Sequence, residues 1–230
     1  MNVTQPWNVV FLLGFIVFFV IRFGYARAAK HESRSISRFG WLEKFLLALM
    51  FPPTVLLPLL YLFTPLLAFA DYEITSVVHW IGATLMVIAL WLFWRSHADL
   101  GMNWSVSLEL RDGHELVTHG VYRFIRHPMY AAIWLWSVGQ GMLLANWLAG
   151  WSVVPVFAAM YWLRTPREED LMCQMFGDQY RTYMRTTGRI VPRFGIVGKR
   201  RADEFSEYGC QQLTAAESVQ TSSEDVRPFE

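Results

Sequence analysis

The sequence carries little charge and only two cysteines. Asp, Glu, Lys and Arg make up 17% of its 230 residues, and the formal net charge is +1. Because no long basic stripe occurs away from the apolar runs, nucleic-acid binding is excluded. Cys173 and Cys210 form no Cys-x-x-Cys pair, which excludes a disulfide framework and a zinc ribbon.

Two motifs of soluble and metal-dependent enzymes are also missing. No G-x-G-x-x-G turn joins a strand to a helix, which argues against a soluble Rossmann fold. The nearest match, Gly139-Gln140-Gly141, lies inside an apolar run, where small residues serve helix packing. The six histidines include no H-x-x-x-H pair, so we expect no metal site. They are His31, His79, His97, His114, His119 and His127.

What the sequence does contain is long uncharged apolar stretches. With 54% hydrophobic and 16% aromatic residues, the chain is typical of membrane proteins. A helix needs about 20 apolar residues to cross a bilayer, and four stretches reach that length. They run from the N-terminus to Ile21, from Phe45 to Ala70, from Ile74 to Trp94, and from Pro128 to Leu163.

The fourth stretch is too long for one helix. Asn146-Trp147 and Gly150 lie near its middle, which indicates a tight helical hairpin of two short spans. The second stretch carries Pro52, Pro53, Pro58 and Pro65, which predict kinks. The expected fold is an all-α integral membrane protein with five transmembrane helices, the last two forming a hairpin.

Basic residues predict the orientation of these helices. Short loops rich in Lys and Arg stay in the cytoplasm, and here every second connection is basic. The prediction is a multi-pass protein with its N-terminus outside and its C-terminus cytoplasmic, without a cleaved signal peptide. The basic residues are Arg22, Arg27, Lys30, Arg34, Arg38 and Lys44, then Arg95, Arg111, Arg123 and Arg126, then Arg164 and Arg167.

Three regions follow from this pattern. Residues 1–96 form an N-terminal region with three spans, and residues 97–197 combine a cytoplasmic connector, the hairpin and a cytoplasmic helical segment. Residues 198–230 turn polar and show no helical or strand periodicity, so we expect a disordered tail.

Polar residues gather in two cytoplasmic segments, and the first ends at Arg126-His127-Pro128. Proline is favoured at the first position of a helix, so the fourth span should begin at Pro128. His127 would then lie at a helix N-terminus, a place suited to a ligand carboxylate. The alternative is that His127 only caps the helix, while Arg126 reaches lipid headgroups.

The second polar segment contains Arg164-Thr165-Pro166-Arg167-Glu168. Its order fits a helix start in which Thr165 is the N-cap and Glu168 closes a capping box. Arg164 could equally be an anchor at the membrane boundary. The competing interpretation assigns both Arg164 and Glu168 to a functional site.

Taken together, these blocks resemble the isoprenylcysteine carboxyl methyltransferase family. The resemblance covers about Trp104 to Phe194 and rests on GVYRFIRHPMY paired with R-x-x-x-E-E-x-x-L-x-x-x-F-G-x-x-Y. It implies a helical membrane bundle with a cytoplasmic cofactor pocket, and catalytic roles for Arg164 and Glu168, with Arg164 facing the methyl acceptor. It also implies that S-adenosylmethionine is bound by His114, Glu115, Leu116, Val117, Tyr122, His127, Pro128, Met129, Tyr130 and Glu168.

The acceptor implied by the resemblance is a lipophilic molecule that enters from the bilayer lipids, such as an isoprenylcysteine carboxylate. Ala131-Ala132, Pro166 and Ser107 depart from the family pattern and leave the acceptor open. A phospholipid or thiol methyltransferase, an NADPH-dependent sterol-type reductase and a non-enzymatic scaffold are the alternatives. Five spans match the compact prokaryotic members of the family, so we predict a bacterial inner membrane.

Overall fold

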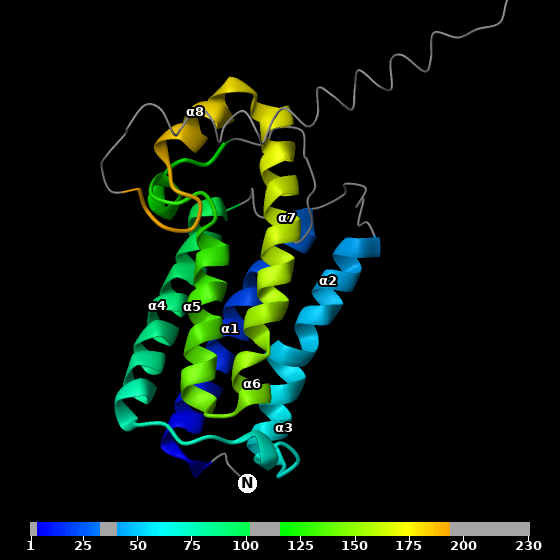
Figure 1. Ribbon diagram of the computed structural model, residues 1–230. Coiled ribbons are helices and arrows are strands. Elements are labelled where there is room, and N and C mark those ends of the chain that lie inside the picture. The colour runs from blue at the N-terminus through cyan, green and yellow to red at the C-terminus, as the bar shows by residue number, and fades with distance from the viewer. Residues whose placement is uncertain (1–3, 33–40, 102–115, 194–230) are drawn as a thin grey trace, which may run out of the picture.

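The computed structural model describes residues 4–32, 41–101 and 116–193, and these residues form helices joined by short turns. The long helices run along one axis of the molecule, and α8 lies across one end (Figure 1). Within the described ranges there is no β-strand, only isolated bridges that pair Asp71 with Asn146 and Ile125 with Gly188. The α-helices are α1 (Pro6–Glu32), α2 (Trp41–Phe51), α3 (Leu57–Phe63), α4 (Ser76–Leu100), α5 (Pro128–Leu144), α6 (Trp147–Trp151), α7 (Val153–Phe176) and α8 (Asp178–Thr186).

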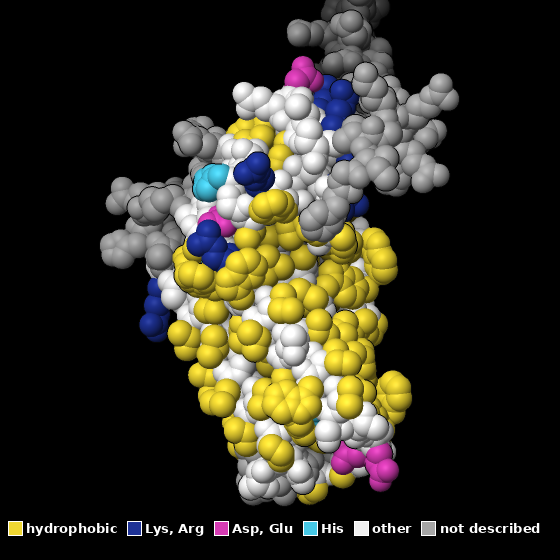
Figure 2. Space-filling view, turned by 90° about the vertical axis from the view of Figure 1, so that its left-hand side faces the viewer, with side chains coloured by type: hydrophobic (Ala, Val, Ile, Leu, Met, Phe, Trp, Pro, Cys, Tyr) yellow, Lys and Arg dark blue, Asp and Glu magenta, His cyan; other side chains and the backbone are white. Residues whose placement is uncertain are grey.

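Three helical segments are long and apolar enough to cross a membrane. They are Pro6–Arg27, Lys44–Phe63 and Ser76–Leu100. Figure 2 shows a broad hydrophobic band, with Lys and Arg gathered toward the upper end and acidic side chains at both ends. The expected class, a helical integral membrane protein, is confirmed. The count of five spans stays a prediction, because α5 has 17 residues and α7 carries charged residues in its second half.

The hairpin turn lies where the sequence predicted it. α5 begins at Pro128 and ends at Leu144, and Asn146 then caps α6 by accepting hydrogen bonds from the backbone N–H groups of Leu148 and Ala149. The Asn146 amide also donates to the Leu67 carbonyl and to Asp71 Oδ1, both over 2.7 Å. One buried asparagine therefore stabilises the turn of the hairpin and connects this turn to the segment between α3 and α4.

The second apolar stretch forms a shorter helix than expected. Its helical part ends at Phe63, not at Ala70, because Thr64 is extended and Pro65 begins a turn. Proline lacks a backbone N–H and disfavours helical geometry in the residue before it, which explains the early end. The expected irregularity at Pro52 and Pro53 is present as a π-helical turn, Pro52–Leu56.

The expected helix start at Thr165 is wrong. α7 continues from Val153 to Phe176 with Pro166 inside it, so Thr165 is not an N-cap and Glu168 closes no capping box. The reason is tertiary packing, which overrides the local signal. Buried residues recur every four positions on α7, at Phe157, Tyr161, Thr165, Glu169 and Cys173. This stripe outweighs the one backbone hydrogen bond that Pro166 cannot make.

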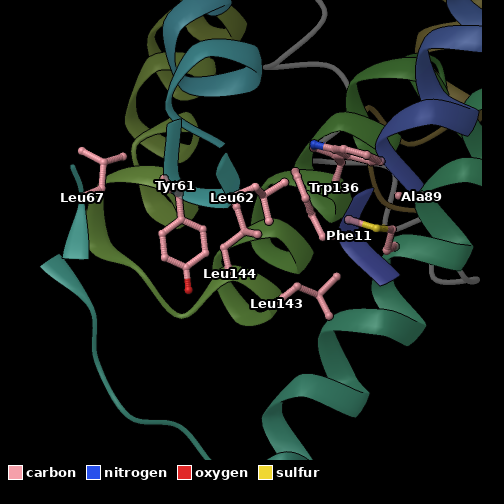
Figure 3. Packing of buried hydrophobic residues seen from close by; sticks show 10 residues of the cluster. Phe11, Tyr61, Leu62, Leu67, Ala89, Trp136, Leu143 and Leu144 are labelled. Carbon is pink, nitrogen blue, oxygen red and sulfur yellow. The ribbon is translucent and has the colours of Figure 1, made fainter. Parts of the chain in front are cut away.

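The main core lies between α1, α3, α4 and α5. Figure 3 shows Phe11, Leu62, Trp136 and Leu144 packed against one another. The polar side chain of Gln140 is buried in this region. It accepts a hydrogen bond from Trp136 Nε1 over 3.0 Å and donates to the carbonyls of Pro53 and Ala149. These bonds satisfy the Gln140 amide and connect α5 to the π-helical turn and to α6.

Candidate active site

The candidate site lies at the end of the bundle where α5 begins, and a tight turn leads into it. The 3₁₀ turn Gly120–Arg123 starts at Gly120, whose φ is +58° and where a Cβ atom would lie 2.1 Å from Asp99 Oδ2. The backbone N–H of Val121 donates to the same carboxylate over 2.9 Å, and Arg95 pairs with it from one turn earlier on α4. Only glycine fits here, which explains the first residue of the GVYRF block.

Tyr122 has a structural position under the site. It is buried, and its hydroxyl donates to the Ser96 carbonyl over 3.2 Å. The hydroxyl of Tyr183, on α8, donates to the Tyr122 carbonyl over 2.5 Å. Burial raises the pKa of both phenols, so both stay protonated donors. Tyr122 therefore joins α4 and α8 to the segment that precedes α5.

The F-G-x-x-Y block forms the corner between α7 and α8. Gly177 has a φ of +53°, which turns the chain after Phe176. Tyr180 is 2% exposed and packs with Cys173 and Tyr183. The α8 helix is thereby held across the end of α7, and the segment after it returns beside residues 125–127.

Backbone and side-chain bonds hold this return segment in place. The N–H of Arg126 donates to the Gly188 carbonyl over 2.8 Å, and that of His127 donates to the Arg189 carbonyl over 2.9 Å. The Arg126 guanidinium donates to the carbonyls of Met184 and Thr187 at the end of α8. Arg126 is therefore an interior residue with an 8% exposed side chain, and the alternative that it reaches lipid headgroups is wrong.

Glu168 receives two hydrogen bonds at one of its oxygens. Tyr130 donates its hydroxyl to Oε1 over 2.6 Å, and Arg164 donates Nε to the same oxygen over 2.7 Å. The other oxygen, Oε2, lies 3.6 Å from His127 Nδ1. Arg164 and Glu168 are four residues apart on α7, so they share one face of the helix.

Glu169, the next residue, is the most heavily hydrogen-bonded carboxylate among the described residues. Arg126 donates Nε and Nη2 to its Oε1 over 3.2 and 3.1 Å, and Arg189 pairs with both of its oxygens. His127 Nε2 lies 3.2 Å from Oε1, and since a carboxylate only accepts, Nε2 carries the hydrogen. The alternative that His127 only caps α5 is wrong, because it makes no side-chain cap bond.

The charges around Glu169 explain its ionisation. Burial opposes the charged form, but the hydrogen bond and charge of His127, together with the guanidiniums of Arg126 and Arg189, lower the pKa of Glu169 to about 2. The same pairing raises the pKa of Arg189 despite its burial. Glu169 is therefore a carboxylate throughout the physiological range.

The structure brings together only part of the predicted set. Arg164, Glu168, His127 and Tyr130 form one network. Pro128 is buried at the first position of α5. Three others lie elsewhere: Tyr122 under the site, Met129 against Ile125 and Ala131, and Leu116 against the cluster of Cys173, Tyr180 and Tyr183. Val117 is partly exposed, and His114 and Glu115 lie outside the described residues.

Three participants were not identified from the sequence: Glu169, Arg126 as an interior partner, and Arg189. The quoted motif contained a signal for the first, because it pairs two glutamates and only Glu168 was chosen. Arg189 follows the motif after α8 and has no local pattern that marks it. Among the described residues, no group of three His, Cys, Asp or Glu side chains could hold a metal ion.

Comparison with known proteins shows which proteins this chain is similar to. Residues 80–174 match the model of the isoprenylcysteine carboxyl methyltransferase (ICMT) family. The chain is 32% identical over 124 residues to the protein-S-isoprenylcysteine O-methyltransferase of Dictyostelium discoideum, which covers 51% of each chain. It is 28% identical over 160 residues to a probable enzyme of the same name in Oryza sativa subsp. japonica, which covers 68% of this chain and 81% of the relative.

A solved structure shares the fold. The eukaryotic intramembrane Ras methyltransferase ICMT, solved without a monobody, has a TM-score of 0.54 and 22% identity, over 83% of this chain and 69% of that one. The chain spans about half the length of the Dictyostelium relative. These relatives are eukaryotic, so the bacterial inner membrane stays a prediction. The match to the isoprenylcysteine carboxyl methyltransferase family therefore covers residues 80–174, which include most of α4, all of α5 and the Arg164–Glu169 face of α7.

Proposed function

We propose that this chain transfers a methyl group from S-adenosylmethionine to the carboxylate of a lipophilic, isoprenylcysteine-like acceptor. The observation that carries the proposal is the position of Tyr130. Its hydroxyl donates to Glu168, while its ring packs with Leu46, Phe157 and Tyr161 from α2 and α7. The polar network therefore adjoins apolar packing between membrane helices, as a lipid-borne substrate requires.

The described residues fit the chemistry of S-adenosylmethionine. This cofactor carries a carboxylate, an ammonium group and a sulfonium cation. Glu168 Oε1 receives hydrogen bonds from Tyr130 and Arg164, and Oε2 lies 3.6 Å from His127 Nδ1. The charge of this carboxylate would pair with a cation of the cofactor. His127 lies at the N-terminus of α5, where the helix dipole favours a carboxylate.

When bound, S-adenosylmethionine supplies a methyl group activated by its sulfonium. Arg164 would orient the acceptor carboxylate, because a guanidinium presents a planar fork to it. An ionised carboxylate needs no general base. The remaining work is alignment and exclusion of water, which together account for several kcal/mol of barrier lowering.

The same proposal places the network at the cytoplasmic face. Arg95 pairs with Asp99 beside the Gly120 turn and Arg164 binds Glu168, whereas Asp71 pairs with Asn146 beyond the other end of α5. The relatives named above are methyltransferases, so the alternatives of a sterol-type reductase and a non-enzymatic scaffold gain no support from them.

Binding and turnover of the purified full chain test this function. S-adenosylhomocysteine should raise the melting temperature and NADPH should not. Labelled methyl groups should pass to an S-farnesylated N-acetylcysteine. Glu168→Gln should weaken S-adenosylhomocysteine binding more than tenfold, about 1.4 kcal/mol, because the amide cannot balance a cation.

Asp170→Asn is the matched control for Glu168→Gln. It removes the same charge two positions further along α7, from a partly buried side chain next to Glu169. Wild-type affinity is expected in that variant. A wild-type chain that binds neither S-adenosylhomocysteine nor S-adenosylmethionine would contradict the proposed function.

A further inference from the structure

Glu169 is a buried carboxylate that the proposed chemistry does not use. Its side chain is 7% exposed, although a buried charge is costly unless it is paired and hydrogen-bonded. The cost is offset by two guanidiniums and one imidazole from two segments: Arg126 and His127 before α5, and Arg189 after α8. Three side chains that are distant from Glu169 in the sequence therefore converge on this one buried carboxylate.

The partners of Glu169 also set the backbone around His127. The His127 N–H donates to the carbonyl of Arg189, whose side chain reaches Glu169. Arg126, next to His127, reaches both Glu169 and the last carbonyls of α8. Moving Glu169 would therefore remove the carboxylate that the side chains of Arg126 and Arg189 share beside His127.

The His127 ring is held on three sides. Its Nε2 lies 3.2 Å from Glu169 Oε1, and its Nδ1 lies 3.6 Å from Glu168 Oε2. Its face stacks on Tyr130, with the ring centroids 5.5 Å apart and the planes 12° from parallel. Among the described residues, Glu169 is the one acceptor of a hydrogen bond from this ring. That bond fixes the ring rotation, and with it the nitrogen that faces Glu168.

We propose that Glu169 is a positioning residue: through Arg126, Arg189 and the Nε2 hydrogen bond, it holds His127 in the orientation that binds the methyl donor. The inference rests on the proposed function, in which His127 and Glu168 contact the cofactor. Glu169 touches no substrate in this role and acts through His127. A purely structural role for Glu169 would not depend on His127.

A double-mutant cycle separates positioning from a structural role. In Glu169→Gln, the KM for S-adenosylmethionine and the dissociation constant of S-adenosylhomocysteine should rise about tenfold, within the range for groups in contact. The kcat of the folded enzyme should stay within about twofold, because Arg164 and Glu168 keep their own hydrogen bond. In a His127→Gln background, the same change should have little further effect on affinity. Asp170→Asn should match wild type.

Each arm has an outcome that counts against the proposal. A structural role predicts a lower active fraction with an unchanged KM, and independent effects predict that Glu169→Gln and His127→Gln add; either result would overturn it. If Glu169→Gln does not fold, Arg189→Gln replaces it, because that side chain is 40% exposed and its loss leaves Arg126 bound to α8. Failure of the wild-type chain to bind S-adenosylhomocysteine would reject the proposed function instead.

Discussion

At the residue scale, the proposed role of Arg164 depends on its guanidinium, which a lysine ammonium cannot replace. Arg164 donates Nε to Glu168 over 2.7 Å, and the proposed function has its guanidinium orient the acceptor carboxylate as well. Lysine cannot make both contacts in the same geometry. Arg164→Lys should therefore lower kcat about tenfold to a hundredfold, the range for a lost hydrogen bond to a charged group of about 1.5–3 kcal/mol.

Affinity for S-adenosylhomocysteine should stay near the wild-type value in Arg164→Lys, as measured by calorimetry alongside methyl transfer. Arg167→Lys is the control, because Arg167 is exposed on the same helix. Full turnover in Arg164→Lys would return Arg164 to the role of a membrane anchor.

A pH effect is expected from Glu169. Its folded pKa of about 2 lies below the ordinary value of 4.5, so the carboxylate contributes stability that is complete above about pH 4.5 and is lost as pH falls toward 2. The contribution is on the order of 3 kcal/mol. The melting temperature of the wild type should fall more steeply between pH 5 and about pH 3 than that of Glu169→Gln.

The same acid titration on Asp170→Asn gives the reference slope, because this variant keeps Arg126, His127 and Arg189 around Glu169. Parallel melting curves for wild type and Glu169→Gln over that range would show that the ion pairs do not stabilise the fold.

At the scale of elements, the stability of the bundle depends on the close approach of α4 and α5. A Cβ atom at Gly82 would lie 2.8 Å from Met142 Cβ and 3.2 Å from the Gly139 carbonyl. Gly82→Ala should therefore separate the helices and destabilise the protein by about 1–3 kcal/mol, the usual cost of overpacking. Thermal unfolding in detergent measures this change.

Gly24→Ala on α1 is the matched control, because a Cβ atom there meets nothing within 4 Å. Replacing a glycine inside a helix should stabilise that helix by about 0.5–1 kcal/mol. Equal melting temperatures for the Gly82 and Gly24 variants would contradict the close packing of α4 on α5.

The distribution of charge over the whole molecule predicts its orientation. Lys and Arg gather toward one end of the molecule (Figure 2), and Asp71 lies with the Asn146 turn beyond the end of α5 opposite to the site. Reporter fusions at Asp71 and after Asn146 should read outside, and a fusion near Arg34 should read cytoplasmic. A cytoplasmic signal at Asp71 would invert the arrangement and place the polar network on the outer face.

Local signals were enough to predict much of the fold. The start of α5 at Pro128 and the turn at Asn146 depend on residues that act on their own backbone, through a fixed φ angle and a side-chain cap. The apolar stretches predicted the helical membrane class because the bilayer imposes a length. The motifs that flank α5 indicated the family, and four of the predicted residues, Arg164, Glu168, His127 and Tyr130, meet in one network.

Tertiary structure determined the features that local sequence signals predicted wrongly or did not predict. Thr165-Pro166 has the form of a helix start, yet burial of one residue in every four along α7 carries the helix through it. The sequence by itself also could not select Glu169 over Glu168, because neighbouring residues on a helix point in different directions. Only the return of Arg189 beside His127 shows which carboxylate is buried among cations, and long-range pairing of that kind leaves no local pattern.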